Sequence, residues 1–158
     1  MTDPVAYGVA TPEQVAGKTG LETMQAAITG ELPRAPIAQP MRFWLSEAEE
    51  GRCVFIGEPD ETLLNPLGTV HGGWALTLID SAAGCACHTT LPAGVGYTTV
   101  ETHCNFTRPI QPGAGPIRAE GRVINRGRSI VTAEATITDA QGRLLAHGGS
   151  TLMVLQPR

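Results

Sequence analysis

The segment that most constrains the fold of this chain is the run of residues 72–87. Apart from Thr77, Asp80 and Ser81, its side chains are apolar or small on every side of a helix. A helix that is apolar all round lies in a protein core or in a membrane, and a membrane span needs about 20 apolar residues. Because this run is shorter and carries a carboxylate, it predicts one central helix buried in the core of a soluble domain.

Segments with β character flank this helix on both sides. Within residues 130–137, apolar residues alternate with small or polar ones, which predicts that one face of the sheet is buried. The expected strands are residues 42–45, 53–56, 97–110, 117–125, 129–138 and 143–155. Consecutive antiparallel pairing, with turns such as residues 111–113, predicts an α+β fold in which an antiparallel sheet wraps around the helix.

The N-terminal part, residues 1–40, is expected to form a helical extension and a linker. Thr11, followed by a proline, has the pattern of a helix start, and residues 21–28 place their apolar side chains on one helix face. Residues 33–40 have the composition of an extended linker. A chain of 158 residues with 42% hydrophobic content is long enough for one core but not for two. Residues 41–158 are therefore predicted to form one domain.

The composition argues against several classes of function. A formal net charge of −4 does not suit a general nucleic-acid binder, which needs a basic face. The N-terminus lacks the pattern of a secretory signal, so we expect a cytoplasmic protein with reduced cysteines and no membrane association. Cys85 and Cys87 stand at a spacing that has no second ligand pair elsewhere. No metal site and no cofactor are predicted.

The most informative short motif is His71-Gly72-Gly73 at the start of the predicted helix, with Asn65 shortly before it. Two glycines there leave backbone N–H groups unpaired and let a ligand approach without a Cβ in the way. The positive end of the helix dipole adds to the attraction for negative charge. Such a site suits the oxyanion of acyl transfer, whereas the Lys-Ser/Thr ending of a phosphate-binding loop is missing.

Asp80 is a carboxylate in the middle of an otherwise apolar helix, where an unpaired charge is costly. Two explanations are open: it hydrogen-bonds a neighbouring strand for structural reasons, or it takes part in chemistry. A helix rises about 1.5 Å per residue, so Gly72 and Asp80 are about 12 Å apart, too far to act on one carbonyl carbon. If both serve one reaction, they come from two subunits, which predicts an obligate homodimer with two shared sites.

Together these motifs resemble the hotdog-fold acyl-CoA thioesterases of the phenylacetate-pathway (PaaI-like) type. The resemblance covers roughly residues 42–155. The matching segments are Asn65, residues 71–73, 78–82, 105–109 and 121–128. The resemblance implies the hotdog fold and hydrolysis of acyl- or aryl-CoA thioesters, with the CoA thioester as substrate and no cofactor. Dimers of this fold often pair again, which implies a homotetramer.

The resemblance also implies roles for single residues. Asp80 matches the carboxylate that acts as general base or nucleophile, and Gly72 matches the residue whose backbone N–H polarises the thioester carbonyl. Asn65 matches an amide that orients substrate or water. Gly73 is expected to contact the substrate, and His71 is expected to shape the loop more than to transfer protons.

One position departs from a related branch of the family. In that branch Glu replaces Asp, and a hydroxyl side chain one turn later helps to hold water. The corresponding position here is Gly84. This difference favours the branch with Asp and leaves the group that holds the water unidentified.

Three arginines are candidates for binding the phosphates of CoA. Arg126 and Arg128 lie at a predicted turn, where guanidinium groups can bind phosphate oxygens in bidentate fashion. A solvated turn without a ligand explains them equally well. Arg108 is a further candidate.

Two other functions are weighed against a thioesterase. A hotdog hydratase or dehydratase usually needs a paired His and acidic residue, whereas His71 lies nine residues before Asp80. A non-catalytic module that binds acyl-CoA is expected to lack the carboxylate or to carry a DNA-binding segment. Because Asp80 is present and the first 40 residues carry little positive charge, the sequence favours an enzyme.

Overall fold

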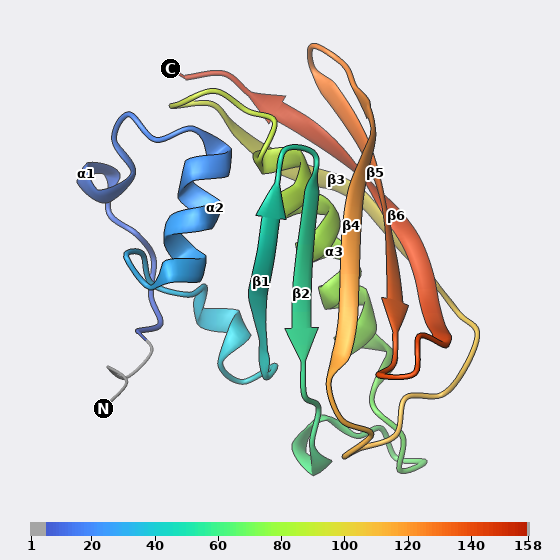
Figure 1. Cartoon of the computed structure of the whole chain (residues 1–158). Helices are drawn as coiled ribbons and strands as arrows, with labels where there is room; N and C mark the ends of the chain where they lie inside the picture. The colour runs from blue at the N-terminus through green and yellow to red at the C-terminus, as the bar shows by residue number, and fades with distance from the viewer. Residues whose placement is uncertain (1–5, 158) are drawn as a thin grey trace.

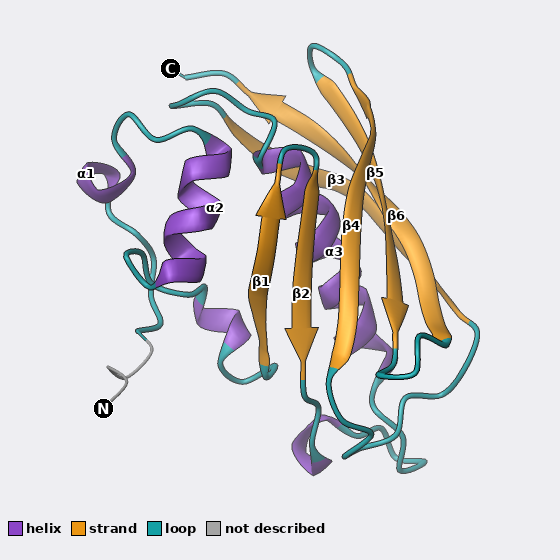
Figure 2. Cartoon of the chain, viewed as in Figure 1, coloured by secondary structure: helices purple, strands orange, loops and turns teal. Residues whose placement is uncertain are grey.

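The computed structural model describes residues 6–157, and a six-stranded antiparallel sheet curves around one long helix (Figure 1). The helices are α1 (Pro12–Val15), α2 (Gly20–Thr29) and α3 (Gly72–His88). The strands are β1 (Phe43–Glu49), β2 (Arg52–Gly57), β3 (Gly96–Phe106), β4 (Ile117–Arg126), β5 (Ile130–Thr138) and β6 (Leu144–Leu155). Figure 2 shows α2 beside β1, at the edge of the sheet, and α1 on the far side of α2. The predicted α+β fold, with a hotdog sheet around a central helix, is confirmed.

The strand order differs from the predicted one at β3. Across the sheet the order is β1-β2-β4-β5-β6-β3, so β3 lies at an edge against β6 and does not pair with β4. The expectation of a hairpin turn at residues 111–113 is therefore wrong. Pro109 and Pro112 lack the N–H that a strand ladder needs, and the Ile110 carbonyl accepts the Val70 N–H just before α3. The segment after β3 consequently passes the start of α3 instead of turning back along β3.

The central helix α3 packs tightly on the concave face of the sheet. Trp74, Leu78 and Ile79 are almost completely buried. The close approach depends on small residues, because a Cβ at Gly121 of β4 would lie 2.2 Å from the Ala82 carbonyl oxygen. The other side of α3 is only half-buried. It carries Leu76, Thr77, Asp80, Ser81, Cys85 and His88. The prediction of a buried helix is confirmed, and Asp80 lies on its more open side.

The N-terminal extension is helical, as predicted, and packs against β1. Thr19 begins α2 with a reciprocal capping box, and Gly30 ends it in the left-handed conformation, at a φ of 84°, that favours glycine. The segment predicted as an extended linker contains one short 3-10 helix, Pro36–Ala38. Ala38 belongs to the main core cluster. Residues 20–38 of the extension are thus part of the packed structure.

Candidate active site

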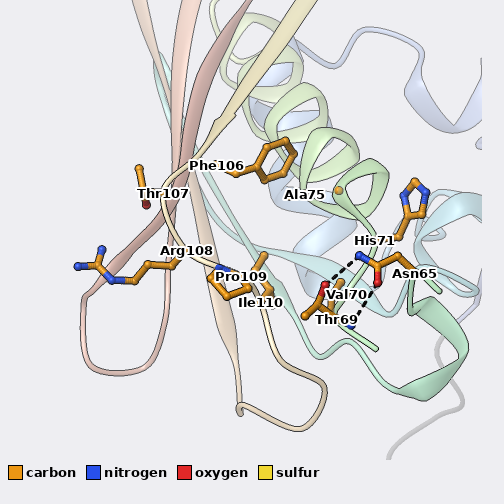
Figure 3. Close-up of a pocket in the computed structure, with 11 residues that line it drawn as sticks. Asn65, Thr69, Val70, His71, Ala75, Phe106, Thr107, Arg108, Pro109 and Ile110 are labelled. Atoms are coloured by element: carbon orange, nitrogen blue, oxygen red, sulfur yellow. Dashed lines mark hydrogen bonds between the residues drawn. The ribbon is translucent and has the colours of Figure 1, made fainter. Parts of the chain in front are cut away.

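Asn65 holds the loop that leads into α3. Its side-chain oxygen accepts hydrogen bonds from the backbone N–H groups of Leu67, at 2.9 Å, and Thr69, at 3.3 Å. Its side-chain amide donates to the Thr69 hydroxyl at 2.8 Å, and Figure 3 shows this pair next to His71. Asn65 therefore organises the loop that delivers residues 71–73. Its role in orienting substrate or water stays a prediction.

His71 caps α3 and thereby decides which backbone donor stays free. Its Nδ1 accepts the Gly73 N–H at 2.8 Å, and its carbonyl accepts the Trp74 N–H. With Nδ1 as acceptor, a neutral imidazole carries its proton on Nε2. Among residues 6–157, the Gly72 N–H has no hydrogen-bond acceptor. Gly72 thus presents the free donor at the positive helix end, whereas the Gly73 N–H is used by the cap.

An open pocket of about 340 Å³ lies in front of this helix end (Figure 3). Its lining residues are Asn65, Thr69, Val70, His71, Gly72, Ala75, Phe106, Thr107, Arg108, Pro109 and Ile110. The ring of Phe106 packs over Gly72, where an added Cβ would lie 3.1 Å from the Cζ atom of the ring. A free backbone donor at the bottom of a partly apolar pocket can hold a carbonyl oxygen that gains negative charge.

Asp80 lies about two helical turns beyond Gly72, on the open side of α3. Its Oδ1 accepts a hydrogen bond from the hydroxyl of Thr99, on β3, at 2.8 Å. Its Oδ2 has no hydrogen-bond partner in the described part of the chain. One oxygen is therefore fixed by the strand while the other is available to a reactant, the arrangement that a general base needs.

Thr99 is a site residue that the sequence does not reveal. It lies 19 residues after Asp80, in the middle of a strand-like run that has no motif of its own. Only the position of β3 beside α3 brings the two side chains together. The hydrogen bond also shows that the structural explanation for Asp80, contact with a neighbouring strand, and the chemical one are compatible.

A second and mostly apolar pocket, of about 440 Å³, lies next to Asp80. It is enclosed by the open side of α3, by β1, by the start of β3 and by the N-terminal extension. The polar residues and thiol at this end are Asp80, Ser81, Cys85, Tyr97 and Thr99. The Tyr97 hydroxyl occupies the space over Gly84, because a Cβ there would lie only 2.8 Å from the hydroxyl oxygen. Gly84 therefore makes room for a hydroxyl from β3.

The thiol and the phenol in this second pocket are poor bases at neutral pH. Burial raises the pKa of Cys85 to about 12, against the opposing effect of a hydrogen bond with Tyr97. Burial also raises the pKa of Tyr97 well above its ordinary value, and the nearby Cys85, Cys87 and Asp80 add to the rise. Both groups therefore stay protonated near pH 7, which leaves the Asp80 carboxylate as the candidate base of this pocket.

Gly72 and Asp80 do not meet within one subunit. They stand eight residues apart on one continuous helix, which corresponds to about 12 Å along its axis. They also line different pockets. The chain thus carries two separate groups that suit acyl chemistry, a free backbone donor at the start of α3 and a carboxylate in its middle.

The candidate arginines lie at two different ends of the sheet. Arg126 and Arg128 flank the β4–β5 hairpin, at the end away from the start of α3 (Figure 1). Burial raises the pKa of Cys87, near the end of α3, to about 11, and the nearby Arg126 opposes that rise. Arg108 instead lines the Gly72 pocket. Within one subunit, only Arg108 of the three is grouped with the loop of residues 65–73.

Three further observations concern residues 6–157. In this range no group of three or more His, Cys, Asp or Glu side chains is placed to bind a metal ion. Cys53, Cys85, Cys87 and Cys104 are free thiols. No helix in the same range has both the length and the apolar composition that a bilayer span requires.

Comparison with known proteins agrees with this geometry. The family model described as "Thioesterase superfamily" matches residues 67–146, which contain all of α3. A candidate esterase of Saccharolobus solfataricus is 30% identical over 110 residues, which cover 70% of this chain and 76% of that protein. This chain belongs to the thioesterase superfamily. The human acyl-coenzyme A thioesterase 13 is 27% identical over 108 residues, which cover 68% of this thioesterase and 76% of the human protein.

A solved structure confirms the fold of this thioesterase independently. The Escherichia coli PaaI protein of the phenylacetic acid degradation operon superimposes with a TM-score of 0.75. The match covers 87% of this chain and 95% of the PaaI chain at 19% sequence identity. At that identity the likeness establishes the hotdog architecture alone. The substrate has to be inferred from the geometry of the site.

Proposed function

We propose that this thioesterase hydrolyses acyl- or aryl-CoA thioesters. The observation that carries the proposal is the presence, on one helix, of a free Gly72 N–H at the positive end and of Asp80 held by Thr99. The name of the human relative, an acyl-coenzyme A thioesterase, supports the same substrate class. The chemistry requires an oxyanion donor, a base and water, so the proposal includes no metal or redox cofactor.

The proposed reaction uses one half-site from each subunit. The Gly72 N–H polarises the thioester carbonyl, and Asp80 of the partner subunit removes a proton from water as the water oxygen attacks the carbonyl carbon. Gly72 stabilises the oxyanion of the tetrahedral intermediate. The C–S bond then breaks, and CoA leaves as a thiolate while the acid is released. Attack by the carboxylate itself, followed by hydrolysis of the anhydride, is the alternative route.

We infer that the two halves meet in a homodimer formed along β3. This strand is at the edge of the sheet, so its outer backbone groups are available to another strand. It also runs beside the open side of α3, where Thr99 reaches Asp80. A two-fold axis across β3 makes the two strands antiparallel, so the starts of the two α3 helices point in opposite directions. Further pairing into a homotetramer is consistent with this arrangement.

Shared sites predict that two inactive variants restore activity to each other. A subunit with Asp80→Asn keeps its Gly72 donor, and a subunit with Gly72→Pro keeps its carboxylate. In a mixed dimer one of the two sites is then intact, so purified mixed dimers should show about half of wild-type activity. The measurement is thiol release by co-expressed, differently tagged subunits after purification through both tags. Mixed dimers without activity would place the whole site inside one subunit.

We also propose that the arginines at the β4–β5 hairpin bind CoA phosphates. The double change Arg126→Ala and Arg128→Ala should raise KM for acyl-CoA by roughly tenfold and leave kcat nearly unchanged, because phosphate contacts bind ground and transition states alike. Thioesters of N-acetylcysteamine, which lack the nucleotide, serve as the control substrate and should show no change. The matched variant is Arg108→Ala, at the other end of the sheet. If it alone raises KM for acyl-CoA, the phosphates lie at the Gly72 pocket.

A thiol-release assay across short, medium, long and aryl acyl-CoA esters separates the proposal from its rivals. Turnover supports the thioesterase. Tight acyl-CoA binding without turnover would indicate a non-catalytic binding module, and hydration of enoyl-CoA would indicate a hydratase. The structure offers the hydratase little support, because His71 uses Nδ1 for the Gly73 N–H and lines a different pocket from Asp80.

A further inference from the structure

The pocket beside Asp80 is closed on one side by residues that precede the segment matched by the thioesterase family model. That segment begins at residue 67. The extension contributes Val9 before α2, Met24 and Ala27 on α2, and Leu32 and Ile37 after it. One wall of the pocket is therefore built by residues outside the segment that the family model matches.

The lining of the pocket is mostly apolar, with Thr23 and Arg34 as the polar residues that the extension contributes. Asp80 and Thr99 stand at one end. The side chains that face them across the pocket come from α2 and from the hydrophobic core, where the rings of Phe43 and Phe55 pack edge to face at 5.7 Å. Met24 packs against the same core cluster. An occupant with a reactive polar head at Asp80 and an apolar body directed toward α2 fits this mostly apolar lining.

The pocket also extends away from Asp80 along α3. It continues along α3 from Asp80 to Cys85, which is about 7 Å farther from the helix start. Gly84 makes room for the Tyr97 hydroxyl, so the tyrosine ring can line the pocket without a clash against α3. The Gly72 pocket of the same subunit lies in the opposite direction and does not compete for this space.

We propose that the N-terminal extension forms the acyl-binding wall of the active site and selects apolar acyl groups larger than acetyl. Aliphatic groups of medium length and groups that end in an aromatic ring fit the volume of about 440 Å³ and the apolar lining. An acetyl group would leave most of the pocket empty. This inference rests on the proposed thioester hydrolysis, because Asp80 identifies the end of the pocket at which the carbonyl lies.

The proposal predicts a defined dependence on acyl length. Burial of each further methylene in an apolar pocket should raise kcat/KM by roughly fourfold, because the group leaves water on binding. The rise should continue from acetyl through medium-length acyl groups and stop when the pocket is full. A phenylacetyl group should be accepted about as well as an aliphatic group of similar area.

The test is a substitution that fills the pocket from the side of the extension. Ala27 is half-buried and lines the pocket, whereas Gln25 lies two residues earlier on α2, is exposed and faces away from it. Ala27→Phe should lower kcat/KM for octanoyl-CoA and phenylacetyl-CoA by at least about tenfold and leave acetyl-CoA within about twofold. Gln25→Phe is the matched control and should leave the whole series unchanged.

The opposite substitution keeps the proposal testable if Ala27→Phe folds poorly. Met24→Ala enlarges the pocket and should move the preferred acyl group toward longer chains. If the dependence of kcat/KM on acyl length shifts in neither variant, or if activity falls equally for acetyl and octanoyl esters, the extension does not form the acyl-binding wall. The proposed thioesterase activity would still stand in that case. Absence of thiol release by the wild type with every ester would instead overturn the proposed function, so the two failures are distinguishable.

Discussion

Replacing Asp80 with Asn is expected to lower kcat for acyl-CoA hydrolysis by roughly 10²- to 10⁴-fold, the usual contribution of a positioned general base. The Asn side chain has nearly the same shape, and its carbonyl oxygen can still accept the hydrogen bond from Thr99. It cannot take a proton from water or attack the carbonyl carbon. The folded structure should therefore persist while turnover is lost. Steady-state thiol release and thermal unfolding on the same preparation measure both effects.

The matched control for this variant is Thr99→Val. It removes the hydroxyl that positions the carboxylate but retains the carboxylate itself, so we expect a smaller loss of kcat than in Asp80→Asn. The informative result is which of the two variants, Asp80→Asn or Thr99→Val, loses more kcat. If Asp80→Asn keeps activity within about tenfold of wild type, Asp80 is a structural partner of β3 and another group activates water.

Replacing Gly72 with Pro is expected to lower kcat by roughly 10²- to 10³-fold, because proline has no N–H to donate to the oxyanion. Proline is tolerated at the first position of a helix, where the N–H has no intrahelical partner. The residue before a proline must be extended, and His71 already has a φ of −60° and a ψ of 135°. The helix should therefore form normally in this variant.

The control for the loss of the N–H is Gly72→Ala. It adds a Cβ at the same place, 3.1 Å from the half-exposed ring of Phe106, but retains the backbone donor. The ring has room to move, so a modest effect on kcat is expected from Ala and a large one from Pro. Equal losses in the two variants would assign the effect to crowding by the side chain instead of to the donor. Far-ultraviolet circular dichroism and kcat on both variants provide the comparison.

Much of the fold follows from residue patterns that are local. The run of residues 72–87 predicts the central helix because its side chains are apolar or small on nearly every side, and Thr11 followed by Pro12 marks the start of α1. The partner of β3 is not predictable in this way. Alternation along a strand indicates which face is buried but not which neighbour it pairs with. Consecutive pairing therefore failed at Pro109 and Pro112.

Some residues of the candidate site are likewise recognisable from local sequence, and others only from the tertiary fold. Gly72 is recognisable because it stands at a helix start, and Asp80 because its charge conflicts with its apolar surroundings. Thr99 carries no such signal, since a threonine in a strand is ordinary and only the tertiary fold brings it to Asp80. The capping of the Gly73 N–H by His71 depends on a side-chain rotamer, which no spacing rule specifies.

The packing of the extension against β1 has a consequence for how such an enzyme can diverge. The donor and the carboxylate belong to α3, which the tight contact between Gly121 and Ala82 holds against the sheet. The facing wall belongs to residues of the extension, which lies beside the edge strand β1. With the acyl wall that we propose, mutations in the extension change the preferred acyl group while the residues on α3 stay the same. Exchange of this segment between homologous genes is then a short evolutionary route to a new substrate.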